Sequence, residues 1–254
     1  MARTGQPSTR HVASVSRAVA LLDAIAEEGG EVGTNALSRR TGINASTVSR
    51  ILATLVEAGV VEHSAGTGRY RLGLRLVQLG NASLDAFDVF DAARLRMDQL
   101  AEQTGESASL SVPGEGVAST VGFARSDAAV QSIARIGRPS VAHATSVGKV
   151  YLAWGGHLPD GDLKSYTPCT ITDRDRILAQ VEQVRCRAWA EADGERDQGL
   201  ASIAAPVLGQ HGELIVILGV QGPADRFDAV ARAAAVPALL DAVTALSVVA
   251  PTGG

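Results

Sequence analysis

The chain has little of what disulfide or metal frameworks require. Its 254 residues include only two cysteines, Cys169 and Cys186, which are too few for a disulfide framework. Together with His143, His157 and His211 they form no pair with metal-ligand spacing such as CxxC or HxxxH. We therefore expect a reducing compartment, no metal site and no cofactor.

A targeting or membrane segment is not recognisable either. The N-terminal stretch MARTGQPSTR has no apolar core, so we expect no secretory signal. The longest apolar stretch, 229–250, is interrupted by Arg232, Pro237 and Asp241, and it predicts a buried helix instead of a membrane span. The expectation is a cytoplasmic protein without membrane partners.

Catalytic motifs are missing as well. There is no GxSxG elbow and no ordered Ser/His/Asp trio. Segment 146–150, SVGKV, is similar to the end of a phosphate loop, but that motif requires glycine where His143 stands and Ser or Thr where Val150 stands. We expect no enzyme. The alternative, an enzyme acting on a small acid with the N-terminal part as an interaction module, stays open.

Charge is distributed unevenly along the chain. The net charge is −4, but residues 1–75 hold nine arginines and six acids, which gives +3 there and −7 for the remainder. The length predicts about two domains. A basic N-terminal module on an acidic body is typical of a DNA reader with a separate regulatory domain.

Residues 34–59 predict two short helices joined by a tight turn. The first would span about 35–41, with Thr34 or Asn35 as its cap and Gly42 as a left-handed end. Asn44 or Ser46 would cap the second. The second helix has an apolar stripe at helical spacing, formed by Val48, Ile51, Leu52, Leu55 and Val56.

The opposite face of the second helix carries short polar side chains and one arginine, namely Ser46, Thr47, Ser49, Arg50 and Thr54. Such a helix fits the major groove of DNA. A helical hairpin with a solvated face is the alternative. The next segment favours DNA, because 60–62 and 69–72 predict strands around a glycine turn. That hairpin would be a wing bearing Arg69 and Arg71.

The segments before this hairpin predict an arm and a helix. Residues 1–11 are polar, and we expect a flexible arm. A helix is predicted over 14–28, with a buried stripe of Val15, Ala18, Val19, Leu22 and Ile25. Arg17 lies off that stripe; it is a candidate phosphate contact, with a plain surface arginine as the alternative.

The remainder predicts an α+β domain with an antiparallel sheet and helices against it. Expected strands are 107–112, 117–123, 128–136, 189–193 and the hairpin 199–207 with 213–221. Expected helices are 85–103, with Phe87, Phe90 and Met97 on its apolar face; 149–153; 175–187, capped by Thr172 or Asp173; and 224–249, kinked or broken at Pro237.

Two places in this domain are candidate ligand contacts. Thr145 and Ser146 open a helix whose free N–H groups can bind a carboxylate, although a plain N-cap is equally consistent. Residues 193–198, DGERDQ, predict a solvated loop in which Glu195 stabilises the rim of a pocket. His143 is expected to be a structural or pocket histidine.

The order and spacing of these segments resemble the IclR family of bacterial transcriptional regulators over nearly the whole chain. In the N-terminal part the likeness rests on SVSRAVALLDAIAE, ALSRRTGINASTVSRILATLVEAGVVE and GRYRLGLRLVQLG. In the C-terminal part it rests on HATSVGKVYLAW, TPCTITD and GLASIAAPVLGQHGELIVILGVQGP. The resemblance implies an arm (1–11), a winged helix-turn-helix domain (12–74), a linker helix (75–86) and a GAF/PAS-like effector-binding domain (87–250).

The resemblance also implies a function. Members of this family bind double-stranded DNA at near-palindromic operators as homodimers, and many form dimers of dimers. They bind a small-molecule effector, often an organic or aromatic acid, and most regulate catabolic operons. We expect a repressor, although no residue distinguishes repression from activation.

Candidate site residues follow from the residues and from the resemblance. The resemblance places Ser46, Thr47, Ser49 and Arg50 at the DNA. The full set of candidate DNA contacts is Arg17, Thr34, Asn35, Ser46, Thr47, Ser49, Arg50, Thr54, Arg69 and Arg71. The candidate effector contacts are Ala144, Thr145, Ser146, Gly148, Trp189, Gly199, Ser202, Ala204 and Gln221. Trp189 and Gln221 depart from the family pattern, so the ligand preference is expected to differ if either faces the cavity.

Overall fold

The computed structural model describes residues 12–84, 89–125, 137 and 139–248. The chain divides into two compact units, Met1–Ala86 and Phe87–Gly254. The expected arm 1–11, the expected strand 128–136 and Phe87 lie outside the described residues.

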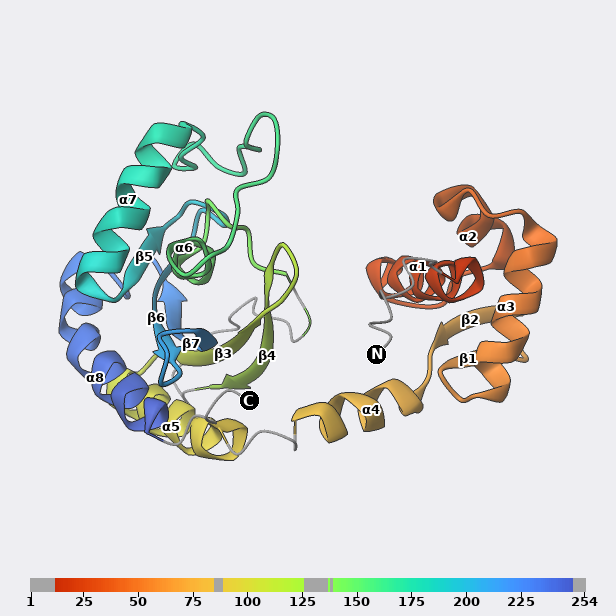
Figure 1. The fold of residues 1–254 in the computed structure, drawn as a ribbon, viewed down its shortest axis with the longest axis horizontal. Helices are drawn as coiled ribbons and strands as arrows, with labels where there is room; N and C mark the ends of the chain where they lie inside the picture. Colours follow the sequence, from red (N-terminus) through yellow and green to blue (C-terminus); the bar gives the residue numbers. More distant parts are fainter. Residues whose placement is uncertain (1–11, 85–88, 126–136, 138, 249–254) are drawn as a thin grey trace, which may run out of the picture. The chain divides into compact units, whose positions relative to one another are not determined.

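The N-terminal unit is a winged helix-turn-helix, as predicted. Its helices are α1 (Ala13–Glu28), α2 (Thr34–Thr41), α3 (Ala45–Glu57) and α4 (Leu74–Leu84), and its wing pairs β1 (Val61–Ser64) with β2 (Arg69–Leu72) antiparallel (Figure 1). The core is a small cluster in which Leu21, Leu37, Val48, Leu52 and Val61 are buried. The predicted apolar stripe of α3 supplies two of these residues and packs the helix against its neighbours.

One cap prediction is confirmed and another is wrong. The side chain of Asn44 accepts a hydrogen bond from the Thr47 N–H at 2.9 Å and so caps α3. Helix α2 begins one residue earlier than expected, with Gly33 as its N-cap and no side-chain cap bond. Thr34 therefore lies inside the helix. Gly42 ends α2 with φ 70°, the left-handed conformation that glycine adopts without strain.

The predicted buried stripe of α1 is partly wrong. Val15 and Val19 are 60% and 51% exposed, whereas Leu21, Ala24 and Ile25 are buried. The apolar arc of this helix is wider than the small core can cover. Helices α2 and α3 pack on the Leu21 side of α1, and the valines are left on its other edge.

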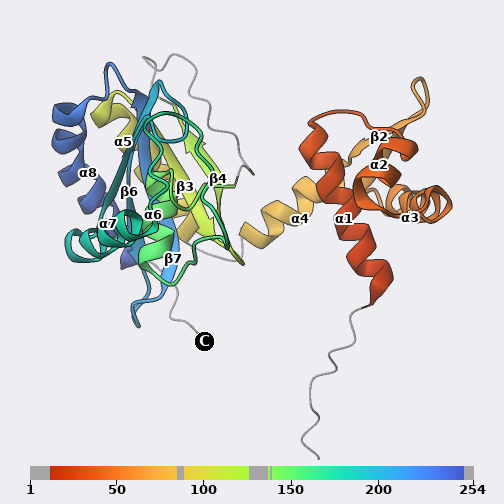
Figure 2. The same cartoon turned by 90° about the horizontal axis from the view of Figure 1, so that it is seen from above.

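The C-terminal unit is an α+β sandwich around a five-stranded antiparallel sheet with strand order β4-β3-β7-β6-β5 (Figures 1 and 2). The strands are β3 (Ser107–Pro113), β4 (Ala118–Ala124), β5 (Ala190–Asp193), β6 (Leu200–Leu208) and β7 (Leu214–Pro223). Helices α5 (Val89–Thr104) and α8 (Ala229–Ser247) cover one face. Helices α6 (Ser146–Ala153) and α7 (Arg174–Arg187) pack against the other.

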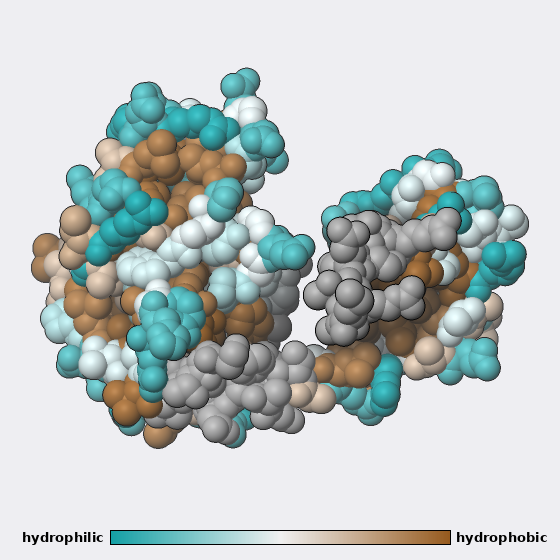
Figure 3. All heavy atoms as spheres, in the orientation of Figure 1, coloured by the Kyte–Doolittle hydropathy of each residue, from teal (hydrophilic) through white to brown (hydrophobic). Residues whose placement is uncertain are grey.

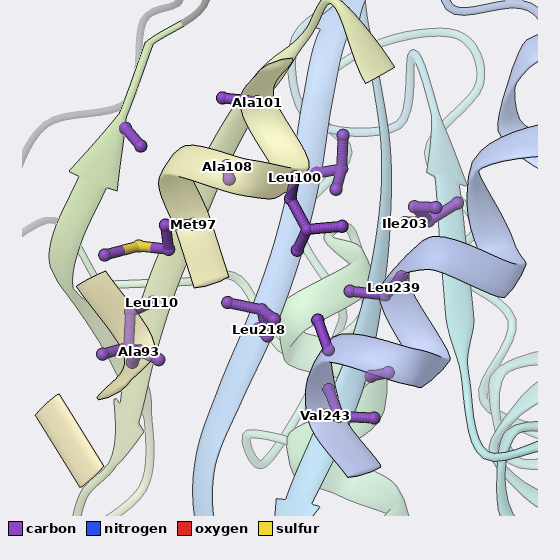
Figure 4. Packing of buried hydrophobic residues seen from close by; sticks show 14 of the residues in the cluster. Ala93, Met97, Leu100, Ala101, Ala108, Leu110, Ile203, Leu218, Leu239 and Val243 are labelled. Carbon is purple, nitrogen blue, oxygen red and sulfur yellow. The ribbon is translucent and has the colours of Figure 1, made fainter. Parts of the chain in front are cut away.

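The larger core lies between the sheet and the α5–α8 layer. Leu100 of α5 and Leu239 of α8 point toward Leu218 and Ile203 of the sheet, whereas Met97 of α5 extends toward β4 (Figure 4). Helix α8 is long and apolar enough by composition to cross a membrane, yet its Leu239, Val243 and Leu246 are buried in this core. The prediction of a buried helix there is confirmed for this face, whereas Val230 of the same helix is exposed.

Helix α8 differs in detail from its prediction. It begins at Ala229, where the Asp228 side chain accepts from the Ala231 N–H at 2.9 Å, and residues 224–228 form a turn. Pro237 lies inside the helix without interrupting it. Of the expected kink or break at Pro237, the break is therefore wrong. Packing of both halves on the sheet outweighs the backbone bond that proline removes.

Strand β3 carries different chemistry on its two faces. Ala108 and Leu110 belong to the α5–α8 core, whereas Ser107, Ser109 and Ser111 are buried on the opposite face. Side chains alternate across a strand. The three serines therefore give the α6 side of the sheet a polar surface in the interior of the unit.

Candidate functional sites

The first candidate site is the exposed face of α3. Ser46, Ser49, Arg50 and Thr54 are exposed and Thr47 is half-buried. Ser46 Oγ donates to Asn44 Oδ1 at 2.9 Å, and Thr54 Oγ1 donates to the Arg50 carbonyl at 3.2 Å. Figure 3 shows hydrophilic to intermediate side chains along the edge of this unit where α3 runs. The face is rich in hydrogen-bond donors and carries no acidic residue before Glu57.

The wing adds two arginines, and each contacts an acidic residue. Arg71 pairs with Glu62 across the hairpin, with Nη2–Oε2 at 2.7 Å. Arg69 Nη1 donates to the Glu31 carbonyl at 3.5 Å. The Thr67 hydroxyl, which donates to Glu31 Oε2 at 2.6 Å, lowers the pKa of Glu31, with smaller contributions from Arg71 and Arg69. Because the Arg71–Glu62 pair is exposed, it is weakly held and can exchange for a phosphate.

The other candidate DNA contacts lie on the two preceding helices. Arg17 is exposed on α1. Asn35 is exposed and Thr34 half-buried in the first turn of α2. By contrast, Arg40 at the end of α2 is paired with Glu27 and Glu28 of α1.

The second candidate site is a cavity of about 80 Å³ on the α6 side of the sheet. Five predicted effector contacts meet there: Ala144, Thr145, Ser146, Ser202 and Gln221. Ser202 and Gln221 are neighbours on β6 and β7, and the Ser146 hydroxyl donates to Ser202 Oγ at 2.8 Å. The start of α6 is thus joined directly to the sheet.

Thr145 is the N-cap of α6. Its Oγ1 accepts the Gly148 N–H at 2.9 Å and donates to the Val141 carbonyl at 2.9 Å. The Gly148 N–H, expected to bind a ligand, is therefore already used. Ser146 and Val147 begin the helix and line the cavity, and first-turn N–H groups have no partner within a helix.

Four predicted effector contacts do not line the cavity among the described residues: Gly148, Trp189, Gly199 and Ala204. Gly148 has a packing role, because an added Cβ would overlap the Val141 carbonyl and the Ala142 backbone. Trp189 packs against the α5–α8 core, and the Arg187 guanidinium lies 3.7 Å from its ring centroid. Ala204 is in the apolar cluster under α6 and α7, and Gly199 is exposed before β6.

Sequence reasoning missed several lining residues: Ser109, Thr120, Ser140, Ala192, Arg196 and Asp197. The alternation of Ser107, Ser109 and Ser111 was a usable signal, because it predicts a polar face on a buried strand. The loop 194–199 gave a weaker signal. Its Asp197 lines the cavity, and Asp193 pairs with Arg232 at 3.0 Å, so neither is simply solvated as expected.

A buried ion pair joins α6 to that loop. Lys149 Nζ lies 2.6 Å from Glu195 Oε1, with both side chains nine-tenths or more buried, and it also donates to the Glu191 carbonyl at 3.0 Å. Burial lowers the pKa of Lys149 although Glu195 opposes the shift. Glu195 lines the cavity, in agreement with the expected rim position. His143 is buried, with Nε2 2.9 Å from the Lys164 carbonyl oxygen.

A winged helix-turn-helix joined to an α+β unit with a polar cavity defines a ligand-responsive DNA-binding regulator. Two family models match the chain: the IclR helix-turn-helix domain over residues 14–65, and the bacterial transcriptional regulator IclR C-terminal domain over residues 81–248. The protein belongs to the IclR family of bacterial transcriptional regulators.

Individual relatives agree with this assignment. The chain is 31% identical to the glycerol operon regulatory protein of Streptomyces griseus, over 94% of this chain and 96% of that protein. An IclR transcriptional regulator from Alicyclobacillus acidocaldarius has a TM-score of 0.84 at 25% identity, covering 94% and 99% of the two chains. An IclR homolog from Microbacterium hydrocarbonoxydans, complexed with 4-hydroxybenzoate, shares the fold with a TM-score of 0.78 at 23% identity, covering 92% and 98%.

Proposed function

We propose that the protein represses a catabolic operon and that a small organic acid in the α6 cavity sets its affinity for DNA. The observation that carries the proposal is the open end of α6. Ser146 and Val147 line the cavity, and free N–H groups at a helix start attract a carboxylate. The Streptomyces griseus relative, named for a glycerol operon, supports a catabolic target, and the 4-hydroxybenzoate complex supports an acid.

The DNA contacts divide into two roles. We propose that Arg50, with Ser46, Thr47, Ser49 and Thr54, reads base edges in the major groove, because these side chains share the exposed face of α3. The arginines of the wing and Arg17 would bind phosphates, with Thr34 and Asn35 at the start of α2. Phosphate contacts position the protein without selecting sequence.

A homodimer is part of the proposal. The exposed apolar side chains of the N-terminal unit include Val12, Val15 and Val19 of α1 and Leu74, Val77 and Leu79 of α4. Figure 3 shows brown side chains over α4. A second copy that covers this apolar surface would set two α3 helices about 34 Å apart, or a multiple of it, on a near-palindromic site. Pairing of such dimers would give a tetramer.

The effector would act through the linker. We propose a DNA-binding domain at 12–74, a linker helix at 75–86 and an effector domain at 87–250, following an arm at 1–11. An effector shifts DNA affinity only by its differential affinity for two arrangements of the dimer, typically about 1–3 kcal/mol. The cytoplasm is the compartment where such a regulator meets DNA.

Turnover of the effector is not part of this function. In the cavity, the Ser146 and Ser202 hydroxyls bond to each other, while the His143 ring nitrogen lies at the Lys164 carbonyl. No nucleophile–base pair therefore exists among the described residues that line the cavity. An effector recovered unchanged after long incubation with the protein is the expected result, and its consumption would favour the enzyme alternative.

The test of the proposed function is binding to DNA upstream of the gene for this protein. Fluorescence anisotropy at several salt concentrations would compare that fragment with a scrambled one and with a pool of genomic fragments. Sequence-selective binding that an added acid weakens is the expected outcome. Equal affinity for every fragment would contradict the proposal, and selective binding that an acid strengthens would contradict repression relieved by effector.

A further inference from the structure

Glu195 is the most unusual group in the cavity wall. It lies between β5 and β6, is only 8% exposed and lines the cavity. Its Oε1 accepts from Lys149 Nζ at 2.6 Å. Its Oε2 is buried, and the described residues provide no hydrogen-bond donor for it. A buried carboxylate oxygen without a donor is costly, so such an atom points to an additional partner.

The position of Glu195 is fixed by its surroundings. Thr170 Oγ1 donates to the Glu195 carbonyl at 2.5 Å, and Thr167 Oγ1 donates to the Gly194 carbonyl at 2.6 Å. Lys149 holds the other carboxylate oxygen. Because both backbone and side chain are held, Oε2 is a pre-organised acceptor, and binding a donor there requires little further ordering.

The two ends of the cavity have opposite preferences. The start of α6, at Ser146 and Val147, presents N–H groups that favour an anion. The carboxylate of Glu195 repels an anion and accepts a donor. A ligand with a carboxylate at one end and a hydroxyl at the other satisfies both. A hydroxyl fits Glu195 better than an ammonium, because Lys149 already balances the charge of Glu195.

The polarity and size of the cavity wall between these ends restrict the class of ligand that fits. It carries the hydroxyls of Ser109, Thr120, Ser140 and Ser202 and the amide of Gln221. No aromatic side chain is among the described lining residues. The volume of about 80 Å³ is well below the roughly 300–1,000 Å³ of pockets for drug-sized ligands. A short, hydroxylated aliphatic chain matches this polarity and size, whereas a benzene ring does not.

We propose that Glu195 is a specificity-determining residue whose Oε2 accepts a hydrogen bond from a hydroxyl group of the effector, and that the effector is therefore a short hydroxylated aliphatic acid. This inference rests on the proposed function, because it takes the α6 cavity as the effector site. Beyond the proposed function, it names the group of the effector that the cavity recognises and the residue that recognises it.

The experiment compares matched acids by titration calorimetry on the full chain. The probes are glycerate, propanoate (which lacks both hydroxyls), β-alanine (which has an ammonium in place of the 3-hydroxyl and lacks the 2-hydroxyl) and 4-hydroxybenzoate. We expect glycerate to bind the wild-type protein at least about tenfold tighter than propanoate, because a hydrogen bond to a charged acceptor is worth that much. Tighter binding of β-alanine or of 4-hydroxybenzoate would overturn the proposed class.

Variants assign the selectivity to Glu195. Lys149→Met/Glu195→Met removes the acceptor and its counter-ion together, which avoids an isolated buried charge. We expect the glycerate-to-propanoate ratio to fall to within about threefold of one, with propanoate affinity little changed. Glu195→Gln is the second variant in case the double variant does not fold, and it should reduce the ratio in part. Glu115→Gln makes the same change at an exposed carboxylate that does not line the cavity, and it should retain the full ratio.

The outcomes separate this inference from the proposed function. A ratio that survives both Glu195 variants, or that is lost equally in Glu115→Gln, overturns the role of Glu195. If no aliphatic probe binds while 4-hydroxybenzoate does, the effector class is wrong and acid sensing stands. If no acid binds at all, the inference is overturned together with acid sensing, and selective DNA binding by the same preparation still tests the regulator itself.

Discussion

The Ser146 hydroxyl donates a hydrogen bond to Ser202 Oγ at 2.8 Å, although 56 residues separate the two in the chain. One serine is the first residue of α6 and the other lies within β6. The bond therefore fixes the open end of α6 against the sheet at the wall of the cavity.

Replacement of Ser202 by alanine should weaken acid binding without changing selectivity among acids. The change removes the acceptor of the Ser146 hydroxyl, and a neutral hydrogen bond contributes about 0.5–1.5 kcal/mol. Calorimetry with glycerate and propanoate should show both affinities reduced by the same factor, because the bond supports the carboxylate end. A loss confined to glycerate would place Ser202 at the hydroxyl end. Ser165→Ala, on an exposed loop, is the control.

Arg50→Ala should cost about 1–3 kcal/mol of affinity for specific DNA, because a bidentate contact to a base edge would be lost. Anisotropy against the selected site and a scrambled site measures the effect. Arg40→Ala is the matched control, since this arginine of α2 is paired with Glu27 and Glu28. Equal behaviour of the two variants would remove Arg50 from the reading surface.

Arg69→Ala and Arg71→Ala should each lower affinity for all DNA sequences alike and reduce the slope of log affinity against log salt by about one. The reason is that a phosphate contact releases counter-ions without reading bases. For Arg71 the net loss includes the broken Glu62 pair, which is exposed and contributes little. A loss seen only on the specific site would indicate base contact by the wing.

Val15→Lys/Val19→Lys should convert dimers to monomers without unfolding the protein. Both side chains are largely exposed in the single chain, so lysine costs little there, whereas in a dimer interface it would bury charge. Sedimentation velocity measures the state. Val230→Lys, at an exposed position on α8, should leave the oligomer intact. A wild-type monomer at micromolar concentration would contradict the dimer.

Gly148→Ala should destabilise the C-terminal unit by about 1–3 kcal/mol, because the new methyl group would overlap the 141–142 backbone. Urea unfolding followed by tryptophan fluorescence reports on this unit, which contains Trp154 and Trp189. Gly80→Ala is the control: nothing lies within 4 Å of an added Cβ on α4, so helix stability should rise slightly. If Gly148→Ala had the same urea midpoint as the wild type, the close contact between α6 and the 141–142 backbone would be contradicted.

Local patterns in the sequence predicted the features that depend on near neighbours. The helical spacing of Val48 and Leu52, the cap at Asn44 and the left-handed Gly42 each depend on residues a few positions apart. Prediction failed where the burial of a side chain depends on parts of the fold that are distant in the sequence. The apolar arc of α1 includes both Val15 and Leu21, and only the packing of α2 and α3 decides which of them is covered.

The residues of the cavity were harder still to predict, because they come together from distant parts of the sequence. Ser146, Ser202 and Gln221 could be proposed from their segments, but Thr120 and Arg196 come to the cavity only because the strand order is β4-β3-β7-β6-β5. Trp189 and Gly148 were expected at the ligand because of the resemblance to the IclR family. Their packing roles depend on contacts with Arg187 and with the 141–142 backbone.

The Lys149–Glu195 pair has an evolutionary consequence. Loss of either residue alone leaves an uncompensated charge in the interior, which typically costs about 3–5 kcal/mol. A descendant lineage can therefore abandon this carboxylate only by exchanging both residues, or by passing through an ancestor close to unfolding. New ligand preferences should arise first at Thr120, Ser140 or Gln221. At these positions a single substitution changes a side chain of the cavity wall without leaving a buried charge unpaired.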